Sequence, residues 1–112
     1  MCIRDSYKSM FMWPLMTFGY EKFLSLCLLP GFDRIMNEFA EINRRVFRAL
    51  ARLPVNFMIS HDDIVLTNGP VCPPEWMHKF IFPRYEEFWG ILKAADKAVS
   101  YTHLTLPTIL LV

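Results

Sequence analysis

The chain has 112 residues, of which 54% are hydrophobic and 21% are charged, and its formal net charge at pH 7 is +1. This length accommodates one small domain, and the composition is that of a globular protein rather than a disordered one. Because the charge is near neutral and no basic run is interleaved with aromatic residues, nucleic acid is not expected as the main partner.

The cysteines and the apolar stretches bear on the cellular setting. Cys2, Cys27 and Cys72 form neither a pair with metal-ligand spacing nor an even disulfide framework, so we expect a reducing, cytoplasmic setting. No secretory signal is visible. The apolar stretch at 13–29 carries Glu21 and Lys22 at its centre, and we therefore expect no membrane span and no membrane partner.

The two ends of the chain differ from its middle. Residues 1–6 have no usable periodicity, and they resemble a string that recurs at the starts of unrelated predicted proteins in which sequencing-adapter DNA has been translated. Residues 100–108 resemble the matching string at the other end, and residues 100–112 contain no Asp, Glu, Lys or Arg. We interpret 1–6 and 99–112 as artefacts, place no function on His103, and take 7–98 as the informative part.

Two helices are predicted in the first half of the informative part. Apolar spacing predicts a short helix within 17–29, which ends at Pro30-Gly31. A longer amphipathic helix of about five or six turns follows and ends at Pro54. Its apolar positions recur at steps of three or four, at Ile35, Phe39, Ile42, Val46, Leu50 and Leu53, with Phe32 and Phe47 widening that face. We interpret its basic residues as a solvated face, with anion binding as the alternative: Arg44, Arg45, Arg48 and Arg52.

A strand, a loop and a further helix complete the pattern. The apolar run Phe57-Met58-Ile59 is too short for a helix, and it predicts a buried strand over 55–60. A turn at Asn68-Gly69-Pro70 follows, and a helix then begins at Pro74 and kinks or restarts at Pro83. The order is helix, long helix, strand, loop, helix. One strand forms no sheet, so we expect parallel neighbours on both sides and a slice of a larger α/β protein.

Asp62 and Asp63 are the best candidates for catalysis, with His61 beside them. Two carboxylates at the carboxyl end of a strand can receive a substrate N–H, orient a general acid or support a metal ligand. The alternative is a turn or capping role, which Asp commonly has. Because successive side chains of a strand point to opposite faces of the sheet, only one of Asp62 and Asp63 can point toward the site. The sequence does not say which one does. His61 could be a base or a ligand, although a histidine at a strand end is more often simply hydrogen-bonded.

The remaining polar residues give weaker signals. Asn68 and Gly69 form a turn that could belong to the rim of a substrate site. No Cys and His have zinc-ligand spacing, so no metal site is assigned. Cys72 lies near a helix start, which lowers the pKa of a thiol, but no partner supports a nucleophilic role. His78 is interpreted as structural or exposed, and the Trp, Met and Phe residues as core.

The order and spacing of several short motifs resemble the uroporphyrinogen decarboxylase (URO-D) superfamily, most closely its branch of cobalamin-dependent methyltransferases. The motifs are Asp62-Asp63-Ile64, Asn68-Gly69-Pro70, Pro74-Glu75 and Phe82-Pro83-Arg84-Tyr85, and the likeness covers most of 7–98. Cys72-Pro73-Pro74-Glu75 stands where the branch usually has Ser-Pro-Glu. The resemblance implies a (β/α)₈ TIM barrel, which needs roughly 250 residues, so this chain would be a fragment of one.

The resemblance also implies an activity for the parent enzyme. That enzyme would decarboxylate acetate side chains of a tetrapyrrole, or move a methyl group to or from a corrinoid, so its partner would be a tetrapyrrole or a corrinoid. Its methyltransferase branch implies zinc held by His and Cys on later strands, whereas no cofactor is expected within this fragment. We expect the isolated chain to be inactive. The alternative is a small non-enzymatic helical module that binds a partner through aromatic faces.

Overall fold

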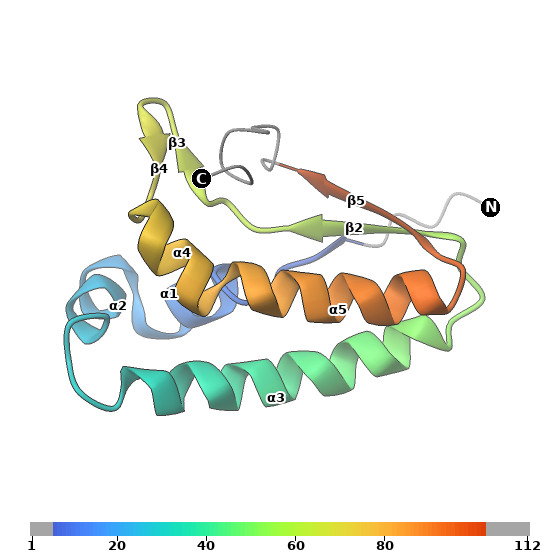
Figure 1. Ribbon diagram of the computed structural model, residues 1–112, viewed down its shortest axis with the longest axis horizontal. Coiled ribbons are helices and arrows are strands. Elements are labelled where there is room, and N and C mark those ends of the chain that lie inside the picture. The colour runs from blue at the N-terminus through green and yellow to red at the C-terminus, as the bar shows by residue number, and fades with distance from the viewer. Residues whose placement is uncertain (1–5, 103–112) are drawn as a thin grey trace.

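A computed structural model describes residues 6–102 of the chain, and the predictions for His103 and for most of both terminal segments lie outside these residues (Figure 1). Along this part helices alternate with strands. The elements are β1 (Ser6–Tyr7), α1 (Met12–Phe18), α2 (Tyr20–Leu26), α3 (Phe32–Ala51), β2 (Phe57–His61), β3 (Val65–Leu66), β4 (Gly69–Pro70), α4 (Pro74–Phe80), α5 (Phe82–Ala94) and β5 (Ala98–Thr102). The fold is therefore of the α/β class.

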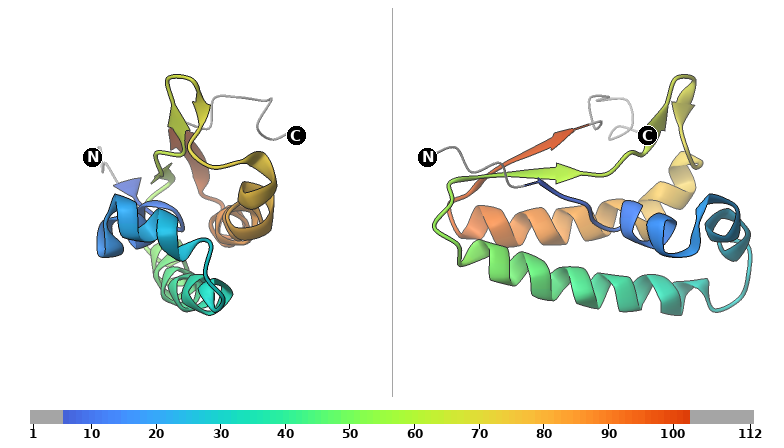
Figure 2. Two further views of the ribbon diagram at one scale, coloured as in Figure 1. Left: turned by 90° about the vertical axis from the view of Figure 1, so that its left-hand side faces the viewer. Right: turned by 180° about the vertical axis from the view of Figure 1, so that it is seen from behind.

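Strands β1, β2 and β5 form a parallel sheet with β2 in the middle. The chain passes from β1 to β2 through α1, α2 and α3, and from β2 to β5 through the β3–β4 hairpin, α4 and α5. All these helices lie on one side of the sheet, so that its other face carries no helix among the described residues (Figures 1 and 2). The expected parallel neighbours of β2 are present, and the sheet is open rather than closed into a barrel.

The outer strands β1 and β5 include residues of the two terminal segments that the sequence analysis sets apart, 1–6 and 99–112. Residues 99–102 belong to β5, and the register places Phe57 beside Ala98 and Met58 beside Val99. Ser6 begins β1 and pairs with Ile59. Strand pairing says nothing about the origin of a sequence, so the interpretation of 1–6 and 99–112 as artefacts stays a prediction.

The helices break at residues that disfavour continuation. Gly19, with φ of +84°, separates α1 from α2. The short helix predicted within 17–29 is present as α2, which ends at Leu26, before Pro30-Gly31, and α1 is a further helix in front of it. A left-handed or otherwise positive φ is adopted readily only by glycine. Ile81 separates α4 from α5, and Pro83 stands in the first turn of α5, where its missing N–H is tolerated. The predicted restart at Pro83 is confirmed.

The long helix α3 is confirmed, but its buried face is rotated from the predicted one. Its buried residues are Phe32, Met36, Ala40, Asn43 and Phe47. By contrast Ile42 is 57% exposed, and Leu53, just beyond the helix, is 44% exposed. The reason is the partner helix, because the ring of Phe47 stacks on Phe88 of α5 at 5.0 Å and this contact fixes which side of α3 faces inward.

The core lies between the sheet and the helices. Its largest fully buried side chains are mostly aromatic and aliphatic, and they come from the helices and the segments beside them, as with Phe11, Phe23, Phe47, Phe88, Met77 and Leu92. Edge-to-face contacts join several of these rings, such as Phe11 with Phe23 at 5.6 Å. The prediction that aromatic and Met residues form the core is confirmed for most of them. No helix between residues 6 and 102 is long and apolar enough to cross a membrane.

Candidate functional site

The side chains along β2 and just beyond it point alternately to the two faces of the sheet, and this places Asp62 and Asp63 on opposite faces. Met58, Ser60 and Asp62 are buried against the helix layer. His61 is partly exposed and Asp63 is exposed, and both belong to the opposite, uncovered face of the sheet. The acidic pair therefore does not act as one unit, because its two carboxylates lie on different sides of the strand end.

The carboxylate of Asp62 accepts five hydrogen bonds. Oδ1 accepts from the backbone N–H groups of Ser9 at 2.9 Å and Met12 at 3.1 Å. Oδ2 accepts from the Ser9 hydroxyl at 2.8 Å, the Phe11 N–H at 3.2 Å and the Tyr85 hydroxyl at 2.6 Å. Because buried carboxylates are costly unless hydrogen-bonded, these donors account for how Asp62 is accommodated at 4% exposure.

These contacts give Asp62 a role in holding elements together. Two of its donors are the N–H groups of Phe11, the N-cap residue of α1, and of Met12, its first residue, and Phe11 itself makes no side-chain cap. A negative charge there also interacts favourably with the helix dipole. Asp62 thus ties the β1–α1 segment and α5 to the carboxyl end of β2, which favours the capping alternative for this residue.

Tyr85 is the partner of Asp62 from α5. Its side chain is 3% exposed, and its ring stacks on Trp89 at 4.9 Å. Burial, followed by the negative charge and the hydrogen bond of Asp62, raises the pKa of the Tyr85 phenol well above its ordinary value of 10.0. Tyr85 is therefore a neutral hydroxyl at physiological pH, and it acts as a hydrogen-bond donor.

His61 and Asp63 come together on the uncovered face. Nε2 of His61 lies 3.4 Å from Oδ1 of Asp63, and the two side chains are 36% and 53% exposed. An imidazole next to a carboxylate can accept or deliver a proton while the carboxylate orients the ring. Of the three residues predicted as catalytic, these two share an accessible position and Asp62 does not.

Asn68 and Gly69 lie in a β-hairpin rather than in a simple loop. Strands β3 and β4 pair antiparallel, with Leu66 opposite Gly69. Asn68 is exposed in the two-residue turn, and Gly69 has φ of +134°, which a residue with a side chain rarely adopts. The hairpin stands beyond the carboxyl end of β2 (Figure 1), and its role as a substrate rim stays a prediction.

Cys72 and His78 occupy different environments from each other. Burial raises the pKa of the Cys72 thiol, so the lowered pKa predicted from the nearby helix start is wrong. The cause is desolvation, which disfavours the charged thiolate. His78 is exposed and contacts the ring of Phe82 edge-to-face at 5.0 Å.

Metal-ligating side chains do not cluster in the described part of the chain. Among residues 6–102 no group of three or more His, Cys, Asp or Glu could hold a metal ion. Zinc and a corrinoid, which the resemblance implies for a larger protein, stay predictions about that protein.

Sequence reasoning missed two members of the Asp62 network. Ser9 lies 53 positions before Asp62 and follows a strand of two residues, so nothing local marked it. Tyr85 belongs to the Phe82-Pro83-Arg84-Tyr85 motif that carries the resemblance, but the motif gives no sign that its hydroxyl reaches Asp62. The available signal is chemical, because the hydroxyl of a buried tyrosine usually has a hydrogen-bond partner.

Comparison with known proteins gave no relative. No protein-family model matches the sequence, no curated protein matches it, and no solved structure matches its fold.

Proposed function

We propose that the chain is part of an enzyme of the uroporphyrinogen decarboxylase superfamily, with the carboxyl end of β2 forming one wall of its active site. The observation that carries this proposal is the His61–Asp63 pair, 3.4 Å apart and partly exposed on the uncovered face of the sheet. In a (β/α)₈ barrel the face opposite the helices is the barrel interior, and active sites lie at the carboxyl ends of the strands.

The arrangement of the strands supports a barrel origin. β1, β2 and β5 lie side by side in the sheet in the order in which they follow along the chain, and they are all parallel. Both connections place their helices on the same side of the sheet (Figure 1). Successive units of a (β/α)₈ barrel have this arrangement, whereas a complete doubly wound sheet has helices on both faces. In a barrel, the uncovered face of β2, with Ile59 and His61, would line the interior.

The residues take separate roles in this proposal. Asp63 receives a substrate N–H, and His61 holds or delivers a proton. Decarboxylation of an acetate side chain breaks the bond between its CH₂ carbon and its carboxylate, releases CO₂ and leaves a carbon that must take up a proton. Asp62 holds the strand end in place through its five hydrogen bonds. Asn68 and Gly69 belong to the rim, and methyl transfer to or from a corrinoid is the second chemistry that the resemblance implies.

A small non-enzymatic interaction module is the competing function. The observation that favours it is a groove along α5, lined in large part by aromatic residues such as Phe82 and Trp89. A module should sediment as a monomer or a defined oligomer. A barrel slice should instead expose sheet edges and unpaired apolar faces, and aggregate.

Long-read sequencing of the source DNA across both ends of this frame is the first test. We expect the frame to continue past Ala98 into further strand and helix units, which would allow the complete enzyme to be expressed. A confirmed stop directly after Val112 would contradict the enzyme proposal and favour the module.

The complete enzyme is then assayed for CO₂ release from uroporphyrinogen and for methyl transfer to a corrinoid. Asp63→Asn and His61→Gln should each lower kcat by about 100-fold or more, because general acid–base groups contribute on this scale. Full activity in both variants would exclude the assigned roles. The isolated chain should show no turnover, and a measured turnover would refute that expectation.

A further inference from the structure

Lys8, directly after β1, points to the uncovered face of the sheet. The residue before it, Tyr7, contacts the ring of Phe47 of α3 edge-to-face at 5.4 Å. The residue after it, Ser9, donates two hydrogen bonds to the buried carboxylate of Asp62. Tyr7 and Ser9 therefore both face the helix layer. Because successive side chains of an extended segment point to opposite faces, Lys8 between them points away from that layer.

The strand register brings Lys8 level with His61. β1 and β2 are parallel, and Tyr7 is paired with Ser60. One residue further along each strand, Lys8 follows Tyr7 and His61 follows Ser60. Neighbouring strands lie about 4.8 Å apart, so the ammonium group of Lys8, on its flexible four-carbon stem, can reach a molecule held by His61 and Asp63.

The ammonium group of Lys8 has no anionic partner among residues 6–102. Its nitrogen lies 3.8 Å from Sδ of Met16, and a thioether is only a weak hydrogen-bond acceptor. None of the ion pairs within this part of the chain includes Lys8, whose side chain is partly exposed. Lys8 can therefore bind an anion without first breaking a salt bridge.

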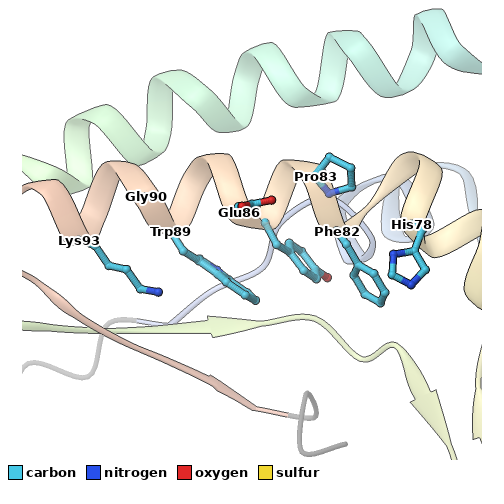
Figure 3. Close-up of a pocket in the computed structure, with 8 residues that line it drawn as sticks. His78, Phe82, Pro83, Glu86, Trp89, Gly90 and Lys93 are labelled. Carbon is cyan, nitrogen blue, oxygen red and sulfur yellow. The ribbon is translucent and has the colours of Figure 1, made fainter. Parts of the chain in front are cut away.

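A second ammonium group lies beside aromatic rings on the helix side of the sheet. Lys93 lines a groove of about 570 Å³ along α5, together with residues such as Phe82 (Figure 3). The helices and the uncovered face lie on opposite sides of the sheet, so a molecule in this groove would not contact His61 and Asp63 (Figure 1). Lys93 is therefore a suitable comparison for Lys8.

We propose that Lys8 binds a carboxylate of the substrate that the reaction leaves in place, and thereby holds the substrate against His61 and Asp63. This inference rests on the proposed function. The charge of Asp63 repels an anionic substrate, and a nearby ammonium group offsets this repulsion. A cation on the departing carboxylate would instead slow decarboxylation, because negative charge leaves that group in the transition state. Lys8 therefore suits a retained carboxylate.

Fluorescence titration of the complete enzyme with uroporphyrin, the oxidised form of the proposed substrate, tests this contact without requiring turnover. Lys8→Met keeps the apolar stem and should raise the Kd for uroporphyrin by about tenfold or more, because a charge-assisted hydrogen bond is lost. Lys8→Gln, also neutral, should have the same effect. Lys8→Arg keeps the charge and should retain most of the affinity, and Lys93→Met should leave the Kd unchanged. All four variants should keep the Tm of the wild type.

Steady-state kinetics provide a second readout. Loss of a contact made equally in the ground state and the transition state raises KM and leaves kcat unchanged, so Lys8→Met should raise KM about tenfold or more at the kcat of the wild type. A wild type that does not bind uroporphyrin, an unchanged Kd in Lys8→Met and Lys8→Gln, or an equal loss in Lys93→Met would each overturn the proposal. Binding that depends on Lys8 without any turnover would support it and refute the proposed decarboxylation.

Discussion

The Tyr85 hydroxyl donates a hydrogen bond of 2.6 Å to Oδ2 of Asp62, and this contact joins α5 to the carboxyl end of the central strand. Asp62 also receives hydrogen bonds from Ser9, Phe11 and Met12, so two separate segments donate to one carboxylate at the end of β2. Asp62 and Tyr85 are both buried, and the loss of a polar partner in such surroundings is expensive. The stability of the fold should therefore respond strongly to changes at this point.

Removal of the Tyr85 hydroxyl should destabilise the protein. Tyr85→Phe keeps the stacked ring and takes away one of the five donors to Asp62, which should lower the free energy of unfolding by about 1–3 kcal/mol. Urea denaturation at neutral pH measures this change. The control is Tyr20→Phe, whose side chain is 52% exposed and which should change stability by about 0.5 kcal/mol at most. Equal effects of the two substitutions would contradict the role assigned to Tyr85.

The two aspartates should differ sharply in their contribution to stability. Asp62→Asn replaces the carboxylate that now accepts hydrogen bonds from Ser9 and the other donors by a neutral amide, whose NH₂ group cannot accept them. It should lower the free energy of unfolding by about 3 kcal/mol or more. Asp63→Asn changes an exposed side chain and should cost less than about 1 kcal/mol. Thermal unfolding of the two variants in the same buffer makes the comparison. A larger loss for Asp63→Asn would show that the faces of β2 are assigned the wrong way round.

Stability should fall at alkaline pH in a way that depends on Tyr85. The folded pKa of its phenol is raised above the ordinary 10.0, so the unfolded chain releases this proton at lower pH than the folded chain does. The stability that the neutral Tyr85 phenol contributes is therefore fully present below pH 10.0, and it is lost as the pH rises through the raised pKa of the folded state. The loss from one such group is at most about 1.4 kcal/mol per pH unit.

The wild type and Tyr85→Phe should therefore converge in stability as the pH rises above 10.0. Burial also raises the pKa of the thiol of Cys27, to about 11, and that of Cys72, but both thiols are present in both proteins and their effects cancel in the difference. Urea midpoints measured at a series of pH values give this difference. A constant gap across the series would mean that Tyr85 does not titrate differently in the two states.

A buried lysine secures the opposite end of β2. The ammonium group of Lys97 donates to the carbonyl groups of Leu53 and Val55, each at 2.6 Å, and so joins the start of β5 to the segment that leads into β2. Lys97→Met keeps the apolar stem but leaves both carbonyls without this donor, and should cost about 2–3 kcal/mol. Lys22→Met, at an exposed position on α2, is the control for urea denaturation. A neutral effect of Lys97→Met would indicate that water replaces the ammonium group.

The sequence predicted those parts of the fold that depend on local pattern. The apolar run at Phe57 predicted β2, the periodicity up to Pro54 predicted α3, and Pro83 predicted the restart at α5. The inward face of α3 was not predictable in the same way, because Ile42 fits the apolar period and is exposed only owing to where α5 packs. Strand β1 has two residues and exists only through its pairing with β2.

The sequence located the candidate site at the end of β2, but it did not tell which of Asp62 and Asp63 faces the helices. Alternation predicted that only one of Asp62 and Asp63 would point inward, and choosing between them required knowing which face of the sheet the helices cover. The five hydrogen bonds of Asp62 span up to 53 positions of the chain, so no local pattern contains them. Which of the named residues carries chemistry stays a prediction.

The alternation along β2 has a consequence for how this segment can change during evolution. Even-numbered positions such as Met58 and Asp62 are constrained by the packing and hydrogen bonds of the helix layer. Odd-numbered positions such as Phe57, His61 and Asp63 are more exposed, with Phe57 at 45%. Substitutions on the odd-numbered side can therefore accumulate and be selected for new chemistry while the fold is retained. One strand thus provides adjacent residues that evolve under separate demands.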